Sequence, residues 1–255
     1  MLDSSIATRY LLPLKEGGSL PGLVEAADLG TYVMKFRGAG QGPRVLVAEV
    51  IVARIARELG LRVPTLVTLE LPAALARYDS DQEVQDLLRA SIGTNLGVDF
   101  LPGSFGYNGV RCRATDDEAL RILWLDAFSA NIDRTWRNPN LLVWHNELWC
   151  IDHGAALYFH HNAPASSPER FARQPFRVGD HVFSEYADQL RDMHGRLRTL
   201  VTDAVVEDAV ATVPTEWLTH GEPEMTVDEW RAWYRAHLMA RRESDAWLPR
   251  PEDAS

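Results

Sequence analysis

Two short stretches of this chain predict its fold and its chemistry: Asn131-Ile132-Asp133-Arg134-Thr135-Trp136-Arg137-Asn138 and Ile151-Asp152-His153-Gly154. In the first stretch an asparagine lies five positions after Asp133, and Asp152 of the second stretch lies nineteen positions after it. Asp133 follows an expected helix and precedes a short loop, so we expect its carboxylate at a surface cleft. Asp152 follows an apolar strand pattern, and Gly154 would permit a sharp turn that aims this second acid into the same cleft.

The order of these side chains fits phosphoryl transfer. That reaction needs a group that orients or deprotonates the attacking hydroxyl, and oxygen ligands for the magnesium ion that accompanies the phosphates. Asp133 would serve the hydroxyl, while Asn138 and Asp152 would bind Mg²⁺, which takes few protein oxygens. The competing interpretation is structural: a surface ion pair between Asp133 and Arg134, an ordinary turn at Asn138, and a hairpin exit at Asp152.

Lys35 adds a cation to this set. It stands in a mainly apolar strand pattern over residues 31–36, where a lone ammonium is costly without an anionic partner. We expect it to contact nucleotide phosphates and to pair with Glu49, which lies in the expected helix over residues 43–59. The alternative for Glu49 is a solvated helix face. Glu58 is a competing partner, but it stands at the helix end and is expected in solvent.

Weaker patterns lie elsewhere in the chain. The turn Gly17-Gly18-Ser19 could place backbone N–H groups over phosphates, or it could be a plain hairpin turn. For Arg134 and Arg137 we favour a structural role beside nearby acids over phosphate binding. The run His160-His161 completes no zinc ligand set.

Hydrophobic periodicity predicts an α+β fold. The first hundred residues show several strand patterns, among them residues 10–14, 23–27 and 31–36, around one main helix. A capping box at Thr115 and Glu118 then begins a mostly helical part, interrupted by a hairpin over residues 141–151. Further helices are expected at residues 184–200, 205–213 and 226–241.

Composition excludes several classes of protein. A net charge of −10 argues against general nucleic-acid binding, which requires an excess of Lys and Arg. Two cysteines are too few for a disulfide framework. The start of the chain has no basic n-region followed by an apolar run, and no segment has the roughly 18 apolar residues of a membrane span. The cytoplasm is therefore the expected location.

The motifs resemble those of a known family. The pattern Asp133-Arg134-x-x-x-Asn138 with Ile151-Asp152-x-Gly154 is similar to the Asp-Arg-His-x-x-Asn and Ile-Asp-Phe-Gly motifs of phosphoinositide-type lipid kinases. The compact size, Val33-Met34-Lys35-Phe36, and Glu49 ahead of Leu59-Gly60-Leu61-Arg62-Val63-Pro64 look more like the HipA-like kinases of bacteria. The resemblance extends from about residue 11 to residue 158.

This resemblance implies a two-lobed protein kinase-like fold, with residues 1–100 as a β-rich nucleotide-covering lobe and residues 101–255 as a helical catalytic lobe. It implies that Lys35 contacts ATP phosphates, that Glu49 steadies Lys35, and that Asp133 is the catalytic acid. It further implies that the metal ligands for Mg²⁺ are Asn138 and Asp152. The segment with Asp99, Phe100 and Leu101 would be the hinge that faces adenine.

The resemblance also limits the reactions that we expect of this chain. We expect Mg-ATP-dependent phosphotransfer to a hydroxyl, that of a Ser or Thr of a protein. The alternatives are a small-molecule kinase, an AMP transferase on the same fold, or a nucleotide-binding pseudokinase. As HipA-like kinases modify a serine in the glycine-rich loop, Ser19 is the expected site of self-phosphorylation. The acceptor and any regulatory partner are not indicated by the sequence.

Overall fold

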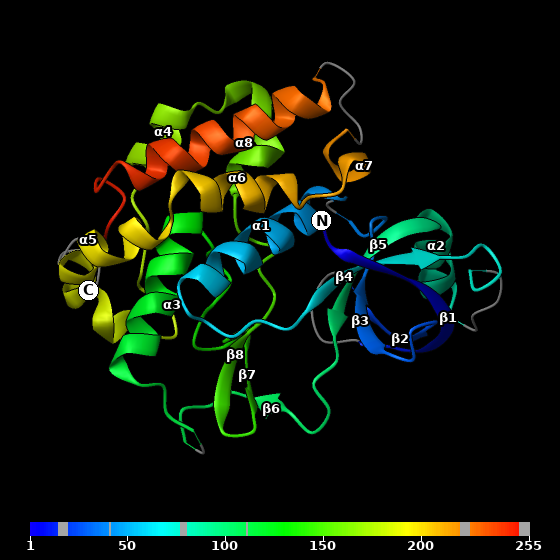
Figure 1. Cartoon of the computed structure of the whole chain (residues 1–255). Coiled ribbons are helices and arrows are strands. Elements are labelled where there is room, and N and C mark those ends of the chain that lie inside the picture. Colours follow the sequence, from blue (N-terminus) through cyan, green and yellow to red (C-terminus); the bar gives the residue numbers. More distant parts are fainter. Residues whose placement is uncertain (15–19, 41, 77–80, 111, 220–224, 250–255) are drawn as a thin grey trace.

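The computed structural model describes residues 1–14, 20–40, 42–76, 81–110, 112–219 and 225–249. Within these ranges the chain is α+β, with strands concentrated in the first hundred residues and helices dominating the rest (Figure 1). Gly17, Gly18 and Ser19 lie outside the described residues.

A closed barrel of strands forms the first part of the fold. The strands are β1 (Asp3–Pro13), β2 (Gly22–Ala26), β3 (Thr31–Lys35), β4 (Leu66–Leu71) and β5 (Gly93–Asp99), and their order around the barrel is β1-β2-β3-β5-β4. Helix α2 (Gln82–Ala90) connects β4 to β5. The strand expected over residues 10–14 is longer at its N-terminal end, because residues 3–6 pair in parallel with β4 and close the barrel. That segment is mostly polar, so it gave no hydrophobic pattern from which a strand could be predicted.

Alternation along β3 sets the orientation of Lys35. Tyr32 and Met34 are buried in the barrel cluster, whereas Val33 and Lys35 point to the outside, where a cavity lies. Successive side chains of a strand point to opposite faces. One face of β3 therefore fills the barrel, and the other supplies a lysine to the site.

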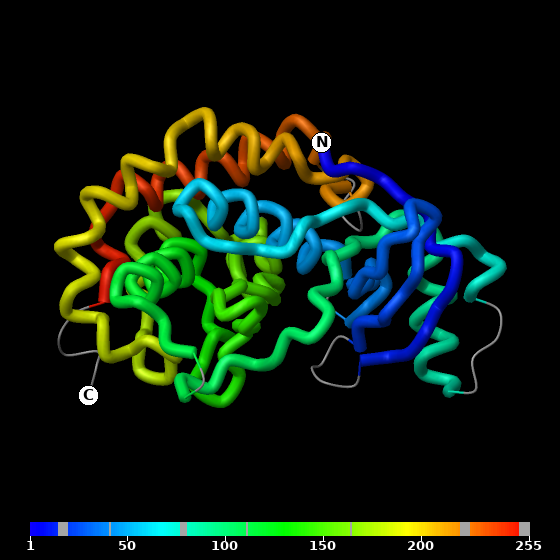
Figure 2. The backbone as a smooth tube through the Cα atoms, turned by 60° about the horizontal axis from the view of Figure 1, so that its bottom comes forward, coloured from blue at the N-terminus to red at the C-terminus, as the bar shows by residue number. Residues whose placement is uncertain are grey.

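Helix α1 (Arg44–Glu58) is buried on most of its surface. It begins after Pro43, ends before Gly60, and packs against α3 (Asp116–Ser129), α6 (Asp203–Ala211) and α7 (Thr215–Leu218). Figure 2 shows the yellow and orange helices arching over α1, and α7 reaches the barrel, where Trp217 Nε1 donates to Thr94 O at 3.1 Å. The residues of α1 belong to the same hydrophobic cluster as those helices, and Leu66 of β4 and Leu96 of β5 join it, whereas the interior of the barrel forms a second cluster. The expected division of the chain near residue 100 stays a prediction.

A small sheet of order β6-β7-β8 holds the two motif stretches together. Strand β6 (Phe105–Gly106) pairs with β7 (Leu141–Trp144), and β7 pairs with β8 (Glu147–Cys150) in the expected hairpin. Leu141 lies opposite Cys150, so the residues just before β7 and just after β8 emerge at the same end of the hairpin.

The remaining elements pack mainly on α3 and on one another. They are η1 (Tyr158–Ala165), α4 (Pro168–Arg173), η2 (Ser184–Gln189), α5 (Leu190–Leu200) and α8 (Val227–Arg242). The expected helix over residues 184–200 starts as a 3₁₀ segment and continues as α5. Capping boxes begin α3 at Thr115 and α8 at Thr226, as their sequences predict. Among the described residues, no helix combines the length and apolar character needed to cross a membrane.

Candidate active site

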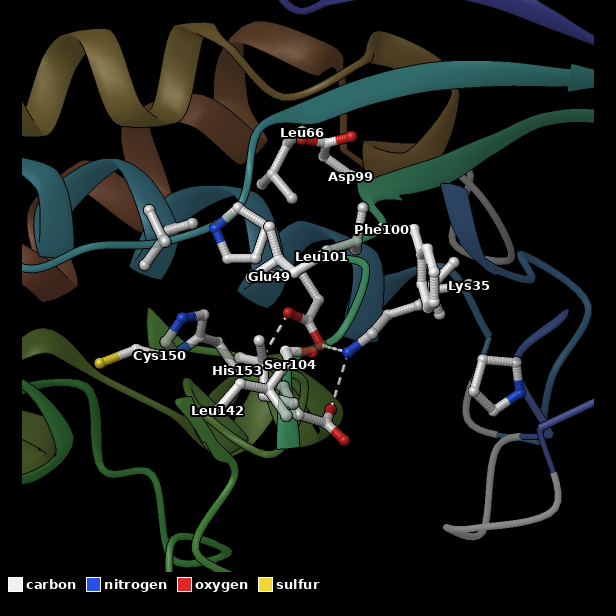
Figure 3. Close-up of a pocket in the computed structure, with 18 of the residues that line it drawn as sticks. Lys35, Glu49, Leu66, Asp99, Phe100, Leu101, Ser104, Leu142, Cys150 and His153 are labelled. Atoms are coloured by element: carbon white, nitrogen blue, oxygen red, sulfur yellow. Dashed lines mark hydrogen bonds and ion pairs between the residues drawn. The ribbon is translucent and has the colours of Figure 1, made fainter. Parts of the chain in front are cut away.

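Lys35, Glu49 and Asp152 form one cluster of contacts in the pocket drawn in Figure 3. The Lys35 ammonium donates to Glu49 Oε1 and to Asp152 Oδ1, the latter at 2.8 Å from Nζ. Glu49 is only 2% exposed, and its Oε2 accepts the backbone N–H of His153 at 2.9 Å. The predicted Lys35–Glu49 pair is therefore present, and Glu49 does not lie on a solvated helix face.

Lys35 and Asp152 each favour the ionised form of the other, whereas burial and the charge of Asp152 raise the pKa of Glu49. Burial alone would lower the pKa of Lys35, but the carboxylates of Glu49 and Asp152 outweigh it and raise that pKa. Lys35 is also the largest cause that lowers the pKa of Asp152 to about 2. The Asp152 side chain is 47% exposed, so it keeps an accessible carboxylate while it is paired.

Asp133 and Lys35 both line a second cavity, and two asparagines hold the Asp133 carboxylate. Its Oδ2 accepts from Asn138 Nδ2 at 3.1 Å and from Asn140 Nδ2 at 3.0 Å. The cavity has a volume of about 600 Å³, and Asp152 lines it together with Asp133 and both asparagines. The structure thus brings the predicted Asp133, Asn138 and Asp152 to one place.

Asn140 was not among the predicted site residues. It adopts a left-handed backbone conformation with φ of 48°, which asparagine tolerates better than most residues. Its only sequence signal is its position directly before the strand pattern of β7, two residues after Asn138. Its contact with Asp133 depends on the folded loop and could not be read from spacing.

The turn at Asp152 differs from the expected one. Asp152 itself has the left-handed conformation, with φ of 57°, whereas Gly154 has no positive φ. Gly154 is required for another reason: a Cβ there would lie 2.5 Å from Val45 Cγ1 and 3.1 Å from Glu49 Oε1. The prediction that Gly154 provides the turn is therefore wrong, because this glycine instead allows α1 to approach the site.

Arg134 does not form the surface ion pair with Asp133 that the structural alternative assumed. It is fully buried, and its Nε donates to Asp126 at 2.6 Å. Its Nη2 lies 3.2 Å from His153 Nδ1, and burial lowers the pKa of His153 to about 3, so this imidazole is neutral. Arg137 stacks over the Trp136 ring at 4.3 Å. These contacts agree with the structural role expected for Arg134.

The first cavity, which Val33 and Lys35 of β3 line, has a volume of about 590 Å³ (Figure 3). Its apolar lining comes from β3, β4, β5, α1 and the segment before β4: Val33, Ala53, Val63, Leu66 and Val98. Lys35, Glu49 and Asp152 line it as well. Such an apolar lining suits a flat organic ring. The predicted hinge residues Asp99, Phe100 and Leu101 line this cavity as well.

The segment that was predicted as a hinge is anchored by its backbone. Asp99 N–H donates to Thr65 O at 2.8 Å, and Phe100 N–H donates to Thr31 O at 3.0 Å. Burial and the charge of Asp28 raise the pKa of the Asp99 carboxyl. These contacts fix the segment at the rim of the cavity.

The two cavities share Lys35, Leu142, Ile151 and Asp152. A model of the HipA-like kinase family matches residues 8–249. The chain belongs to the HipA-like kinase family. The family resemblance expected from the motifs is thus confirmed, and membership supports a kinase that transfers a phosphoryl group and uses ATP.

Solved structures resemble this HipA-like kinase in fold. The crystal structure of a Helicobacter pylori proinflammatory kinase, CtkA, matches with a TM-score of 0.55 and 11% identity, over 92% of each chain. The crystal structure of the golgi casein kinase matches with a TM-score of 0.45 and 11% identity, over 94% of this chain and 72% of that one. No curated protein matches the sequence.

Proposed function

We propose that this HipA-like kinase is a Mg-ATP-dependent phosphotransferase with the two-lobed protein kinase-like fold, and that it phosphorylates Ser or Thr hydroxyls of a protein. The nucleotide-covering lobe would comprise residues 1–100 and the catalytic lobe residues 101–255. The observation that carries the proposal is the junction of the two cavities at Lys35 and Asp152. The first cavity suits the adenine base, and the second holds Asp133.

Each residue has a distinct role in this arrangement. Lys35 would contact the phosphates that extend from the first cavity, and Glu49 would hold the ammonium in place. Asp133 would orient the acceptor hydroxyl and accept its proton as the oxygen attacks the γ-phosphorus and the bond to the ADP oxygen breaks. Because Asp133 Oδ2 already accepts two amide groups, Oδ1 is the oxygen that faces the acceptor.

The donor set fits a magnesium ion. Asp152 offers an exposed carboxylate and Asn138 an exposed amide, both at the rim of the cavity with Asp133. Within the described ranges, no cluster of three or more His, Cys, Asp and Glu side chains could hold a metal ion by itself. Mg²⁺ binds through one or two protein oxygens plus phosphate oxygens, so it suits this site when nucleotide is present. The ion would neutralise charge on the transferring group.

Labelled nucleotides test the proposal. Purified protein is incubated with a pool of Ser/Thr peptides, or with small alcohols, and with ATP labelled at the α- or the γ-phosphate. We expect label from the γ position only, on peptides, and none after chelation of magnesium. Transfer of α label would indicate an AMP transferase, and label confined to small alcohols would indicate a small-molecule kinase.

Matched variants separate catalysis from folding. Asp152→Asn should abolish transfer with the fold retained, whereas Asp192→Asn, on the exposed face of α5, should transfer at the wild-type rate. Neither transfer nor an ATP-induced thermal shift in the wild type would refute the nucleotide-dependent function altogether.

A further inference from the structure

Asp126 is a fully buried carboxylate close to the C-terminal end of α3. Its Oδ1 accepts from Asn131 Nδ2 at 2.9 Å, and its Oδ2 accepts from Arg134 Nε at 2.6 Å and from His181 Nε2 at 3.0 Å. Burial opposes ionisation of this group, but Arg134 and His181 outweigh burial and lower its pKa. A charge in this position is costly unless it is paired, and here it has three donors.

One arm of contacts extends from Asp126 through Asn131. The Asn131 amide donates to Asp126, and its Oδ1 accepts the backbone N–H of Asp133 at 3.2 Å. The backbone N–H of Asn131 also donates to the Asp126 carbonyl at 2.8 Å. The main chain of Asp133 is therefore fixed to the end of α3 through a single buried asparagine.

A second arm extends through Arg134. Its guanidinium Nη1 donates to the Asn140 carbonyl and also to the carbonyl of Ile151 at 3.3 Å. The Asn140 amide in turn donates to Asp133 Oδ2 at 3.0 Å. Arg134 thus connects the end of the loop that carries Asp133 with the start of the stretch that carries Asp152.

We propose that Asp126 is a positioning residue that sets the backbone and the carboxylate of Asp133 through Asn131, Arg134 and Asn140. The inference rests on the proposed function, since Asp133 is the group that would meet the acceptor. Asp126 itself lines neither cavity at Lys35. It acts on the reaction only through the loop.

Two variants interrupt the network at opposite ends. Asp126→Asn keeps the shape of the side chain but removes the charge that faces Arg134. Asn140→Gly removes the amide that contacts Asp133, keeps the carbonyl that accepts from Arg134, and suits the left-handed φ of 48°. Val206→Ala, in the buried face of α6, is the control for a core change remote from the loop.

Turnover per folded molecule and the KM for ATP are measured for each protein, with the folded fraction taken from circular dichroism. We expect kcat to fall by roughly tenfold or more in both network variants, with the KM for ATP within about threefold of wild type. Val206→Ala should keep the wild-type kcat per folded molecule. Network variants that match Val206→Ala, or that lose ATP binding together with kcat, would overturn the proposal.

A second readout does not depend on catalysis. The side-chain amide signals of Asn140 and Asn138 in a ¹H–¹⁵N spectrum report their hydrogen bonds to Asp133. Asp126→Asn should shift the Asn140 signals, and unshifted signals would overturn the proposal even if the wild type transfers no phosphate. Should Asp126→Asn fail to fold, Asn140→Gly still tests the outer end of the network through kcat and the Asn138 signals.

Discussion

Replacing Gly154 with alanine tests how closely α1 must approach the site. The added Cβ would lie 2.5 Å from Val45 Cγ1 and 3.1 Å from Glu49 Oε1, whereas carbon atoms in contact prefer about 3.5–4.0 Å. The shortfall is about 1 Å. Valine in a helix has one strongly preferred rotamer, so Val45 cannot easily rotate away and the start of α1 must retreat. Overpacking of this kind costs about 1–3 kcal/mol of unfolding free energy.

The retreat of α1 should also reduce catalysis. Glu49 moves with α1, and a displacement of about 1 Å in a catalytic group can lower turnover about 10²-fold. Urea denaturation and the labelled-ATP assay measure the two effects. Val45→Ala combined with Gly154→Ala should restore most of both, because the distance from the new Cβ to Val45 Cβ is an ordinary 3.8 Å. The control is Gly179→Ala, where a Cβ meets no described atom within 4 Å. If Gly154→Ala is as stable as this control, or the double variant is no better than the single one, the reasoning is wrong.

Two further predictions concern stability. Arg241 is fully buried and donates to four main-chain carbonyls at the ends of α3 and α4. Arg241→Ala should therefore lower the free energy of urea unfolding by about 3–5 kcal/mol. The control Arg235→Ala removes an exposed ion pair of the same helix and should lower it by at most about 1 kcal/mol, and similar losses for the two variants would contradict the prediction. The pKa of Asp152 is lowered to about 2 in the folded protein, chiefly by Lys35. Between pH of about 4 and 2 this carboxyl therefore binds fewer protons in the folded than in the unfolded protein, and its contribution to stability should be lost as the pH falls through that interval. Asp152→Asn should flatten the pH dependence of urea unfolding over that interval, and an unchanged slope would refute the assignment.

Local sequence signals could predict the parts of the site that are close in the chain or that follow a regular pattern. The strand patterns on either side of residues 145–146 predict a hairpin, and a hairpin necessarily brings Asn138 and Asp152 to the same end. Lys35 was identifiable because a lone lysine in a mainly apolar strand pattern is costly without an anionic partner. These inferences need only the geometry of one element.

The remaining features depend on contacts between elements. Asp126 stands within an apolar helix without a motif around it, and its role becomes visible only once Arg134 and His181 converge on it. The function of Gly154 depends on how near α1 lies, which no local pattern encodes. The parallel pairing of β1 with β4 likewise involves polar residues whose partners are about sixty positions away.

The packing assigns the members of the central cluster to different parts of the molecule. Lys35 belongs to β3 of the barrel, whereas Glu49 belongs to α1, which shares the hydrophobic cluster of the later helices. Glu49 is also bonded to the backbone of His153, next to Asp152, so the two carboxylates are fixed to the same body. Leu66 of β4 and Leu96 of β5 also belong to that hydrophobic cluster, so the barrel is joined to the helices by packing as well as by the two Lys35 contacts. We therefore expect a displacement of either β3 or α1 to change the contact between Lys35 and Glu49, whereas the contact between Glu49 and the His153 backbone depends on α1 and the segment after β8.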